Sequence, residues 1–236
     1  MKKYIGTKQI EAEPMTRGDA WGKHLLREKP STENFDDEGY HVRYEDGYES
    51  WTPKDVFEKA YKIAETPVDR MQIEAEEVNG RYVKLAAFID SGKMDEVVND
   101  MYNKCLLEMQ CCTMFDYIRL LDTRIQRMQG SDSAEVRKMN FGMAIMALKA
   151  GYPIRRSGWN GKGLMVFKQV PAHIESDVIP KMQSLPQSAK DLILKGKGFI
   201  DYTSQCLIYN ENTGRADSWV PSISDVFADD WEIVLS

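Results

Sequence analysis

The chain has 236 residues, of which 42% are hydrophobic, 29% charged and 10% aromatic, and these proportions are typical of globular protein. They exclude disorder of the whole chain. No run of about 18 apolar residues occurs, and the residues that follow Met1 to Gly6 are largely polar or charged, so we expect neither a membrane-spanning helix nor a signal peptide. The expected location is therefore the cytoplasm, with no membrane partner.

The 31 basic and 37 acidic residues give a formal charge of −6. This balance argues against duplex DNA as a partner, because phosphate neutralisation needs clustered Lys and Arg. The cysteines form no Cys-x-x-Cys pair and the histidines are scattered, so we expect free thiols, no metal site and no cofactor. These residues are Cys105, Cys111, Cys112, Cys206, His24, His41 and His173.

Residues 1–66 read as a small α+β module. Alternating apolar residues from Tyr40 to Tyr44, followed by Asp46-Gly47, predict a β-hairpin with one packed face. Thr52 as a cap and Pro53 at the first helical position predict an amphipathic helix that ends near Ala64. The many aromatic side chains of this segment can furnish either a core or a stacking surface, and the alternation favours a core.

Residues 67–129 change to a helical period, and residues 130–138 read as a linker. The first predicted stripe is Val68, Met71, Ala75, Val78, Tyr82, Leu85 and Ile89. The second is Met94, Val98, Met101, Cys105, Met109, Cys112, Phe115, Ile118, Leu121, Ile125 and Met128. Only Ser91 to Lys93 separate the two stripes, which predicts an antiparallel helical hairpin. Because two helices bury only one seam, we expect this hairpin to pack on a neighbouring domain or on another subunit.

Residues 139–236 predict an α+β domain with an antiparallel sheet. A helix capped by Asn140 and stopped by Gly151 precedes a hairpin formed by Ile154 to Arg156 and Leu164 to Val170. Further strands are expected at Phe199 to Tyr202, Cys206 to Tyr209, Ala216 to Val220 and Trp231 to Val234, after a short helix capped by Ser188 with Asp191.

The turn of this hairpin concentrates the residue types that recognise a phosphorylated aromatic ligand. Arg and Lys neutralise phosphate, glycines let backbone amides approach oxygen atoms, Trp offers a face to a base, and Asn reads a base edge or a ribose hydroxyl. The alternative is a hairpin tip whose Trp covers the core, and spacing leaves both open. Arg156 and Gly163 occupy positions that a Walker P-loop reserves for Gly and for Ser or Thr, so the loop is not of that kind. The candidate residues are Arg155, Arg156, Ser157, Trp159, Asn160, Gly161, Lys162 and Gly163.

The candidates for acid–base chemistry are the clustered carboxylates of Asp225 and Asp229-Asp230, which lie close to Trp219 and Trp231 in the sequence. The competing interpretation is local: Ser222 or Ser224 caps a turn of helix, with Asp225 in its first turn. No histidine or metal-ligand spacing accompanies these residues, which favours the capping role.

A set of short motifs runs through residues 139–236: Asn140-Phe141-Gly142, Ala147-Leu148, Gly151, Arg155-Arg156, Gly158 to Gly163, Trp219 with Ser222 and Asp225, and Asp229-Asp230-Trp231. Together they resemble the phage family called Thoeris anti-defence two, with the Gly-Trp-Asn-Gly-Lys-Gly run as a fairly specific part. The resemblance implies a non-catalytic sponge that binds glycocyclic ADP-ribose made by bacterial TIR-domain enzymes. It also implies that some members bind cyclic dinucleotides made by cGAS-like enzymes, and that members assemble as homotetramers with sites between subunits.

The resemblance adds Trp219, Ser222 and Asp225 to the expected ligand-binding residues and places the protein in the host bacterial cytoplasm, acting against Thoeris and, through cyclic dinucleotides, CBASS. Residues 1–66 resemble a small phage module more weakly, through patterns that include Lys3 to Lys8 and Gly47 to Trp51. The hairpin resembles helical segments that accompany the module in gut phage proteins. The stretch from His173 to Lys197 departs from the family by being longer and more helical, and the turn at Tyr209 to Asn212 departs from the tighter turn that the family often has.

Two further hypotheses compete with the sponge. One is a phage interaction or scaffold protein, in which the N-terminal module and the hairpin recruit a partner. The other is a nucleotide-processing enzyme that uses Asp225 and Asp229. A sponge needs a pre-organised pocket and slow release, and the absence of a nucleophile–base pair from the sequence motifs suits that need better than turnover.

Overall fold

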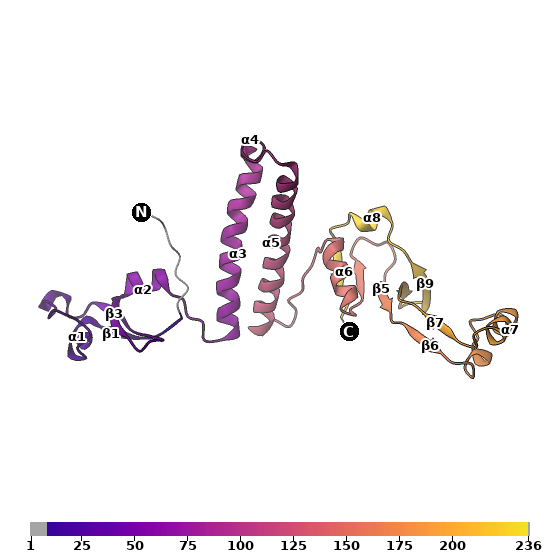
Figure 1. The fold of residues 1–236 in the computed structure, drawn as a ribbon, viewed down its shortest axis with the longest axis horizontal. Coiled ribbons are helices and arrows are strands. Elements are labelled where there is room, and N and C mark those ends of the chain that lie inside the picture. The colour runs from indigo at the N-terminus through magenta and orange to yellow at the C-terminus, as the bar shows by residue number, and fades with distance from the viewer. Residues whose placement is uncertain (1–8, 236) are drawn as a thin grey trace. The chain divides into compact units, whose positions relative to one another are not determined.

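The computed structural model describes residues 9–235, and the chain divides into two compact units at Glu74 and Ala75. Figure 1 shows the order of helices and strands, which confirms the predicted α+β class. Among the described helices, none has the length and apolar character needed to cross a bilayer. The Lys3 to Lys8 pattern lies outside the described residues.

A three-stranded antiparallel sheet of order β1-β2-β3 forms the first unit. Its elements are β1 (Ile10–Thr16), α1 (Arg17–Gly22), the 3-10 turn η1 (Thr32–Asn34), β2 (Glu38–Tyr44), β3 (Glu49–Pro53) and α2 (Lys54–Ala60). The predicted hairpin is β2–β3, and Gly47 turns it with a φ of +82°. Val42 is fully buried, and the rings of Tyr40 and Phe57 stack with centroids 4.1 Å apart. These two aromatic side chains therefore pack against each other, as the alternation favours.

The predicted helix boundaries in this unit are wrong at both ends. Thr52 pairs with Tyr40 in the sheet, so it does not cap a helix, and Pro53 stands at the cap position instead. The helix α2 ends at Ala60 rather than near Ala64, because Tyr61 already has an extended backbone with a φ of −129°.

Three helices make up the predicted hairpin: α3 (Pro67–Asp90), α4 (Lys93–Val97) and α5 (Met101–Met128). The rings of Tyr82 and Phe115, 5.7 Å apart, join α3 to α5, which run side by side in Figure 1. The second predicted helix is interrupted after Val97. Asp100 restarts it as an N-cap whose carboxylate accepts hydrogen bonds from the amides of Tyr102 and Asn103.

The predicted stripe of α3 is confirmed as buried or half-buried, but that of α5 is wrong in its first half and again at Met128, which is 53% exposed. Met101, Cys105, Met109, Cys112 and Phe115 are exposed. The buried and half-buried apolar residues are instead Leu107, Cys111, Met114, Ile118, Leu121 and Ile125. Each step of three residues turns the side chain by about 60° around the helix, so four successive steps of three moved the predicted stripe from one face to another.

The second unit contains a five-stranded antiparallel sheet of order β10-β4-β5-β8-β9. Its strands are β4 (Ile154–Arg156), β5 (Leu164–Gln169), β8 (Gln205–Asn210), β9 (Arg215–Trp219) and β10 (Trp231–Ile233), all close to the predicted strands. The helix α6 (Phe141–Lys149) packs on one face. Asn140 caps α6 by accepting from the Met143 amide, and Gly151, with a φ of +94°, follows its end, both as predicted.

Trp231 stands at the centre of this domain. It is fully buried, and three aromatic rings surround it at centroid distances of 5.6, 5.5 and 6.2 Å: Phe141, Trp159 and Trp219. Its indole Nε1 donates to the backbone carbonyl of Asp225, 3.1 Å away. The remaining buried core is Met139, Met143, Ala144, Leu148, Ile154, Val166 and Ala228.

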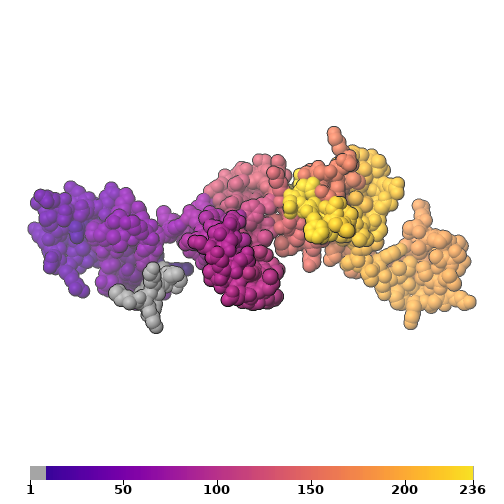
Figure 2. Space-filling model, turned by 90° about the horizontal axis from the view of Figure 1, so that it is seen from above, coloured from indigo at the N-terminus to yellow at the C-terminus, as the bar shows by residue number. Residues whose placement is uncertain are grey.

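Residues 172–202 form a separate lobe, coloured orange in Figure 2. It contains a two-stranded sheet, β6 (Ala172–Ile174) with β7 (Ile200–Tyr202), the 3-10 turn η2 (Ile179–Lys181) and α7 (Gln187–Lys195). The strand β6 has no counterpart in the sequence prediction. The predicted cap is also wrong, because Pro186 stands at the N-cap of α7 and Ser188 lies inside the helix.

We predict that Trp231→Ala destabilises the domain by about 3–5 kcal/mol, since it removes the ring on which three others pack. Phe227→Ala is the matched control: Phe227 is 80% exposed, so its loss should change stability by less than about 0.5 kcal/mol. Urea unfolding followed by circular dichroism measures both. Equal unfolding midpoints for the two variants would contradict the central position of Trp231.

Candidate functional site

The β4–β5 loop, residues 157–163, is held at its start by Arg156. The guanidinium Nε donates to Asp230 Oδ1 over 2.7 Å, and Nη1 donates to Asp225 Oδ1 over 3.0 Å. Nη1 also reaches the backbone carbonyl of Ser224 at 3.2 Å. The side chain of Arg156 is only 19% exposed, and two carboxylates balance its charge. We therefore interpret it as an anchor of the loop, with little charge left for a ligand phosphate.

Asp225 is the second part of this anchor. It lies in the helical turn α8 (Ile223–Val226), where Ser222 and Asp225 form the reciprocal capping box that the sequence favours. The amide and hydroxyl of Ser222 donate to Oδ2 over 2.9 and 2.8 Å, and the indole of Trp159 donates to Oδ1 over 3.2 Å. Burial by itself raises the pKa of Asp225, but the hydrogen bonds from Ser222, Arg156 and Trp159 outweigh it and hold that pKa below the ordinary value. The group is therefore a carboxylate at neutral pH.

Asp230 completes the anchor, and its role was missed from the sequence. Its Oδ2 accepts the amide of Gly158 over 2.8 Å, and its backbone carbonyl accepts the amide of Ser157 over 3.0 Å. A Cβ on Gly158 would lie 2.6 Å from Asp230 Oδ2, which explains the glycine without a ligand. Burial opposes the charge of Asp230, yet the bonds from Arg156 and Gly158 keep its pKa lowered. In the sequence, the one indication of this role was that Asp230 directly precedes Trp231, which the structure shows to be fully buried.

The indoles of Trp159 and Trp219 are both packed on the core. Each meets Trp231 edge to face, with interplanar angles of 77° and 80°. Both residues are half-buried, and Trp159 is also fixed by its hydrogen bond to Asp225. Their arrangement agrees with the core-cover interpretation, and it leaves a stacking base only the part of each indole that faces solvent.

The far end of the loop rests on the turn between β8 and β9. Asn212 Nδ2 donates to the Lys162 carbonyl over 2.8 Å, and the Glu211 amide donates to the Gly163 carbonyl over 2.9 Å. Gly163 has a φ of +76°, and a Cβ there would lie 2.5 Å from Asn212 Nδ2. This glycine is therefore needed for the turn itself.

Between these two anchored ends, the middle of the loop keeps its donors free. No acceptor within residues 9–235 takes the amide hydrogens of Asn160, Gly161, Lys162 or Gly163. The Lys162 ammonium is exposed and has no ion-pair partner in the described part of the chain. Consecutive free amides beside an ammonium are suited to an anion such as a phosphate. Arg155, the cation just before Arg156, is partly exposed and paired with Glu232 at 3.1 Å.

The predicted acid–base pair does not share one environment. Asp225 is buried and accepts from four protein donors, so taking up a proton would cost it those hydrogen bonds. Asp229 is exposed. Across residues 9–235, no group of three or more His, Cys, Asp and Glu side chains is arranged to hold a metal ion.

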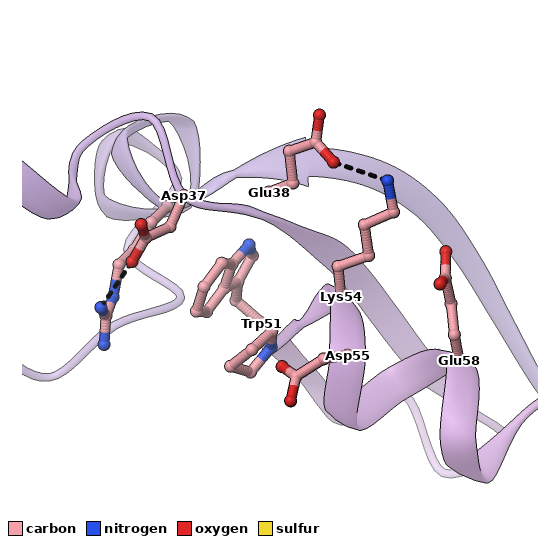
Figure 3. Close-up of a pocket in the computed structure, with 8 residues that line it drawn as sticks. Asp37, Glu38, Trp51, Lys54, Asp55 and Glu58 are labelled. Atoms are coloured by element: carbon pink, nitrogen blue, oxygen red, sulfur yellow. Dashed lines mark hydrogen bonds and ion pairs between the residues drawn. The ribbon is translucent and has the colours of Figure 1, made fainter.

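A hollow of about 410 Å³, which was not predicted, lies in the first unit (Figure 3). Trp51 forms part of its wall, with the Arg17 guanidinium 5.4 Å from the indole centroid. Arg17 pairs with Asp37 at 3.1 Å, and Lys54 pairs with Glu38 at 2.6 Å. Since these charges are matched inside the unit, the hollow carries no specific indication of a ligand.

We predict that Arg156→Met destabilises the protein by about 2–3 kcal/mol, because it leaves two part-buried carboxylates without their shared cation. Arg155→Met is the matched control, since its single exposed ion pair should be worth less than about 1 kcal/mol. The measurement is the unfolding midpoint in urea. Equal unfolding midpoints for the Arg156 and Arg155 variants would contradict the interpretation of Arg156 as the anchor of the loop.

Two family models match separate parts of the chain. Residues 139–234 match the family model described as the Thoeris anti-defense 2-like domain, and residues 65–127 match a family model named Sequestin. The Thoeris anti-defense 2 protein of Bacillus phage SP01 is 33% identical over 102 residues, which are 41% of this chain and 96% of that protein. Through this C-terminal segment, the chain belongs to the Thoeris anti-defense 2 family.

Proposed function

We propose that this protein is a phage anti-defence protein that captures a cyclic nucleotide immune signal, glycocyclic ADP-ribose, in the host cytoplasm and thereby blocks Thoeris. The similarity to the SP01 protein, which extends over nearly all of that protein's length, supports the role against Thoeris. The free donors of the β4–β5 loop support an anionic ligand, and they are the observation that carries the proposal.

The ligand contacts follow from which groups remain available. A pyrophosphate carries two adjacent anionic groups, and the amides of Asn160 to Gly163 with the Lys162 ammonium supply the matching donors. The side chains of Ser157 and Asn160 are exposed beside them and suit hydroxyl or base-edge contacts. In this proposal Arg156 and Asp225 do not contact the signal. They act indirectly, because they hold the loop in its shape.

The proposal has no chemical step. Capture requires a loop whose shape is set before binding, since ordering a mobile loop would reduce affinity. The hydrogen bonds of Arg156, Asp230 and Asn212 supply that order at both ends of the loop. Asp225, with its lowered pKa and four donors, is poorly suited to serve as a base near neutral pH.

Two extensions belong to the same proposal. Cyclic dinucleotides also present phosphates and bases, so they are a second ligand class through which the protein would act on CBASS. Assembly as a homotetramer, with sites between subunits, is the form that the family resemblance implies.

We predict that glycocyclic ADP-ribose binds the full-length protein and that Lys162→Ala weakens binding about tenfold or more, since a charge-assisted hydrogen bond is worth about 1.5–3 kcal/mol. Lys168→Ala is the control, because Lys168 is an exposed lysine that lies on β5 outside the loop. Titration calorimetry measures both affinities. Equal weakening by the two variants, or no binding to the wild type, would contradict the site.

A separate experiment distinguishes capture from catalysis. After incubation, the complex is heated and the released molecule is identified by mass spectrometry, and we expect the intact signal in full yield. A new product that disappears in Asp225→Asn or Asp229→Asn would replace the capture proposal by an enzymatic one.

A further inference from the structure

The sequence contains two Asn-Gly dipeptides, Asn79-Gly80 and Asn160-Gly161, which lie in different backbone environments. In such a dipeptide the amide nitrogen of the glycine can attack the side-chain carbon Cγ of the asparagine, because glycine has no side chain to hinder the approach. Both asparagines are exposed, so water reaches both. The backbone around each dipeptide therefore decides which of the two can react.

The first dipeptide lies in the middle of the long helix α3. Helical dihedral angles are fixed, and the Gly80 amide hydrogen is donated to the carbonyl four residues earlier. The Gly80 nitrogen is thereby held in the helical hydrogen bonds and away from Cγ of Asn79. We expect Asn79 to be stable, which makes it a control within the same molecule.

The second dipeptide lies in the open middle of the β4–β5 loop, outside the helices and strands. No acceptor within residues 9–235 takes the Gly161 amide hydrogen, and within that range the Asn160 side chain takes part in no hydrogen bond. The bonds that fix the loop lie on either side, at the Gly158 amide and the Lys162 carbonyl. The attacking nitrogen and the side chain that it attacks are therefore both unrestrained by hydrogen bonds.

The neighbours of this dipeptide favour the attack. The exposed Lys162 ammonium directly follows it, and a positive charge stabilises the negative charge that develops on the attacked amide oxygen. Packing also favours glycine at position 161, since a Cβ there would lie 2.4 Å from Leu164 Cδ1. Any other residue would have to displace the half-buried Leu164 side chain. The loop therefore needs the residue that makes Asn160 reactive.

We propose that Asn160 is a site of spontaneous deamidation, and that the carboxylate formed there ends anion binding by the loop. Gly161 loses its amide proton to hydroxide, and its nitrogen forms a bond to Asn160 Cγ. The bond from Cγ to Nδ2 breaks, and the nitrogen leaves as ammonia after taking up a proton from water. Water then opens the resulting succinimide ring at either carbonyl, which yields aspartate or isoaspartate. Because the nucleophile is the deprotonated amide, the reaction accelerates as pH rises.

Either product places a negative charge among the free amides of Asn160 to Gly163. Isoaspartate also adds a carbon to the backbone, which displaces the amides that follow it. A like charge repels the phosphate that these donors would bind. This consequence rests on the proposed function, whereas the reaction at Asn160 does not, because it needs only the protein and water.

The reaction is tested on the full-length protein without a ligand, during incubation for several days at mildly alkaline pH. Proteolysis and mass spectrometry then locate the mass increase that accompanies replacement of the amide NH2 by OH. We expect Asn160 to react at least about tenfold faster than Asn79, since α3 has to open locally before Asn79 can react. Equal rates at the two sites, or an unchanged Asn160, would overturn the proposal.

The consequence for binding is tested by titration calorimetry with glycocyclic ADP-ribose. We expect Asn160→Asp to weaken binding about tenfold or more relative to Asn160→Ser, which removes the same amide without adding a charge. Asn79→Asp is the matched control, because it adds the same charge at an exposed position of α3 and should bind as the wild type does. Equal affinities of Asn160→Asp and Asn160→Ser would refute the effect of the charge. A wild type that binds no nucleotide would refute the proposed function and this effect together, whereas the peptide map still decides the reaction.

Discussion

One guanidinium group holds the candidate site together. Arg156 ends a strand at one side of the β4–β5 loop, and its partners Asp225 and Asp230 follow about 70 residues later, on both sides of the turn that leads into β10. Because the same carboxylates also bind the Trp159 indole and the Gly158 amide, the loop, the helical turn α8 and the central Trp231 form one hydrogen-bonded unit. In this unit, anchoring and recognition use different groups. The guanidinium of Arg156 binds carboxylates inside the protein, whereas the donors that remain available to a ligand are backbone amides and Lys162.

Much of the fold could be predicted because its signals are local. Asn140 and Gly151 mark the ends of α6 through cap chemistry, and alternating residues mark the strands. The sequence predicted which segment forms the site, but not how its side chains are arranged. Residues 155–163 show which polar groups are present, but not which of them are hydrogen-bonded within the protein. The pairing of Arg156 with Asp230 is a contact over 74 residues, which spacing along the chain does not reveal.

The hairpin shows a second kind of limit. Its two helices were predicted from the period, but α5 carries apolar residues on two faces, and a period alone does not say which face meets α3. The structure buries the face of Leu121 and leaves that of Met109 exposed. An apolar residue that looks like core in the sequence is thus exposed in the structure.

Amide hydrogen exchange, resolved by residue, tests the central claim most directly. The account predicts slow exchange at Gly158, whose amide is held by Asp230, and fast exchange from Asn160 to Gly163 in the free protein. Addition of glycocyclic ADP-ribose should slow exchange at those four amides and leave Gly158 as it was. Four amides that are protected without a ligand, or that exchange equally fast in its presence, would contradict a loop anchored by Arg156 and open at its centre.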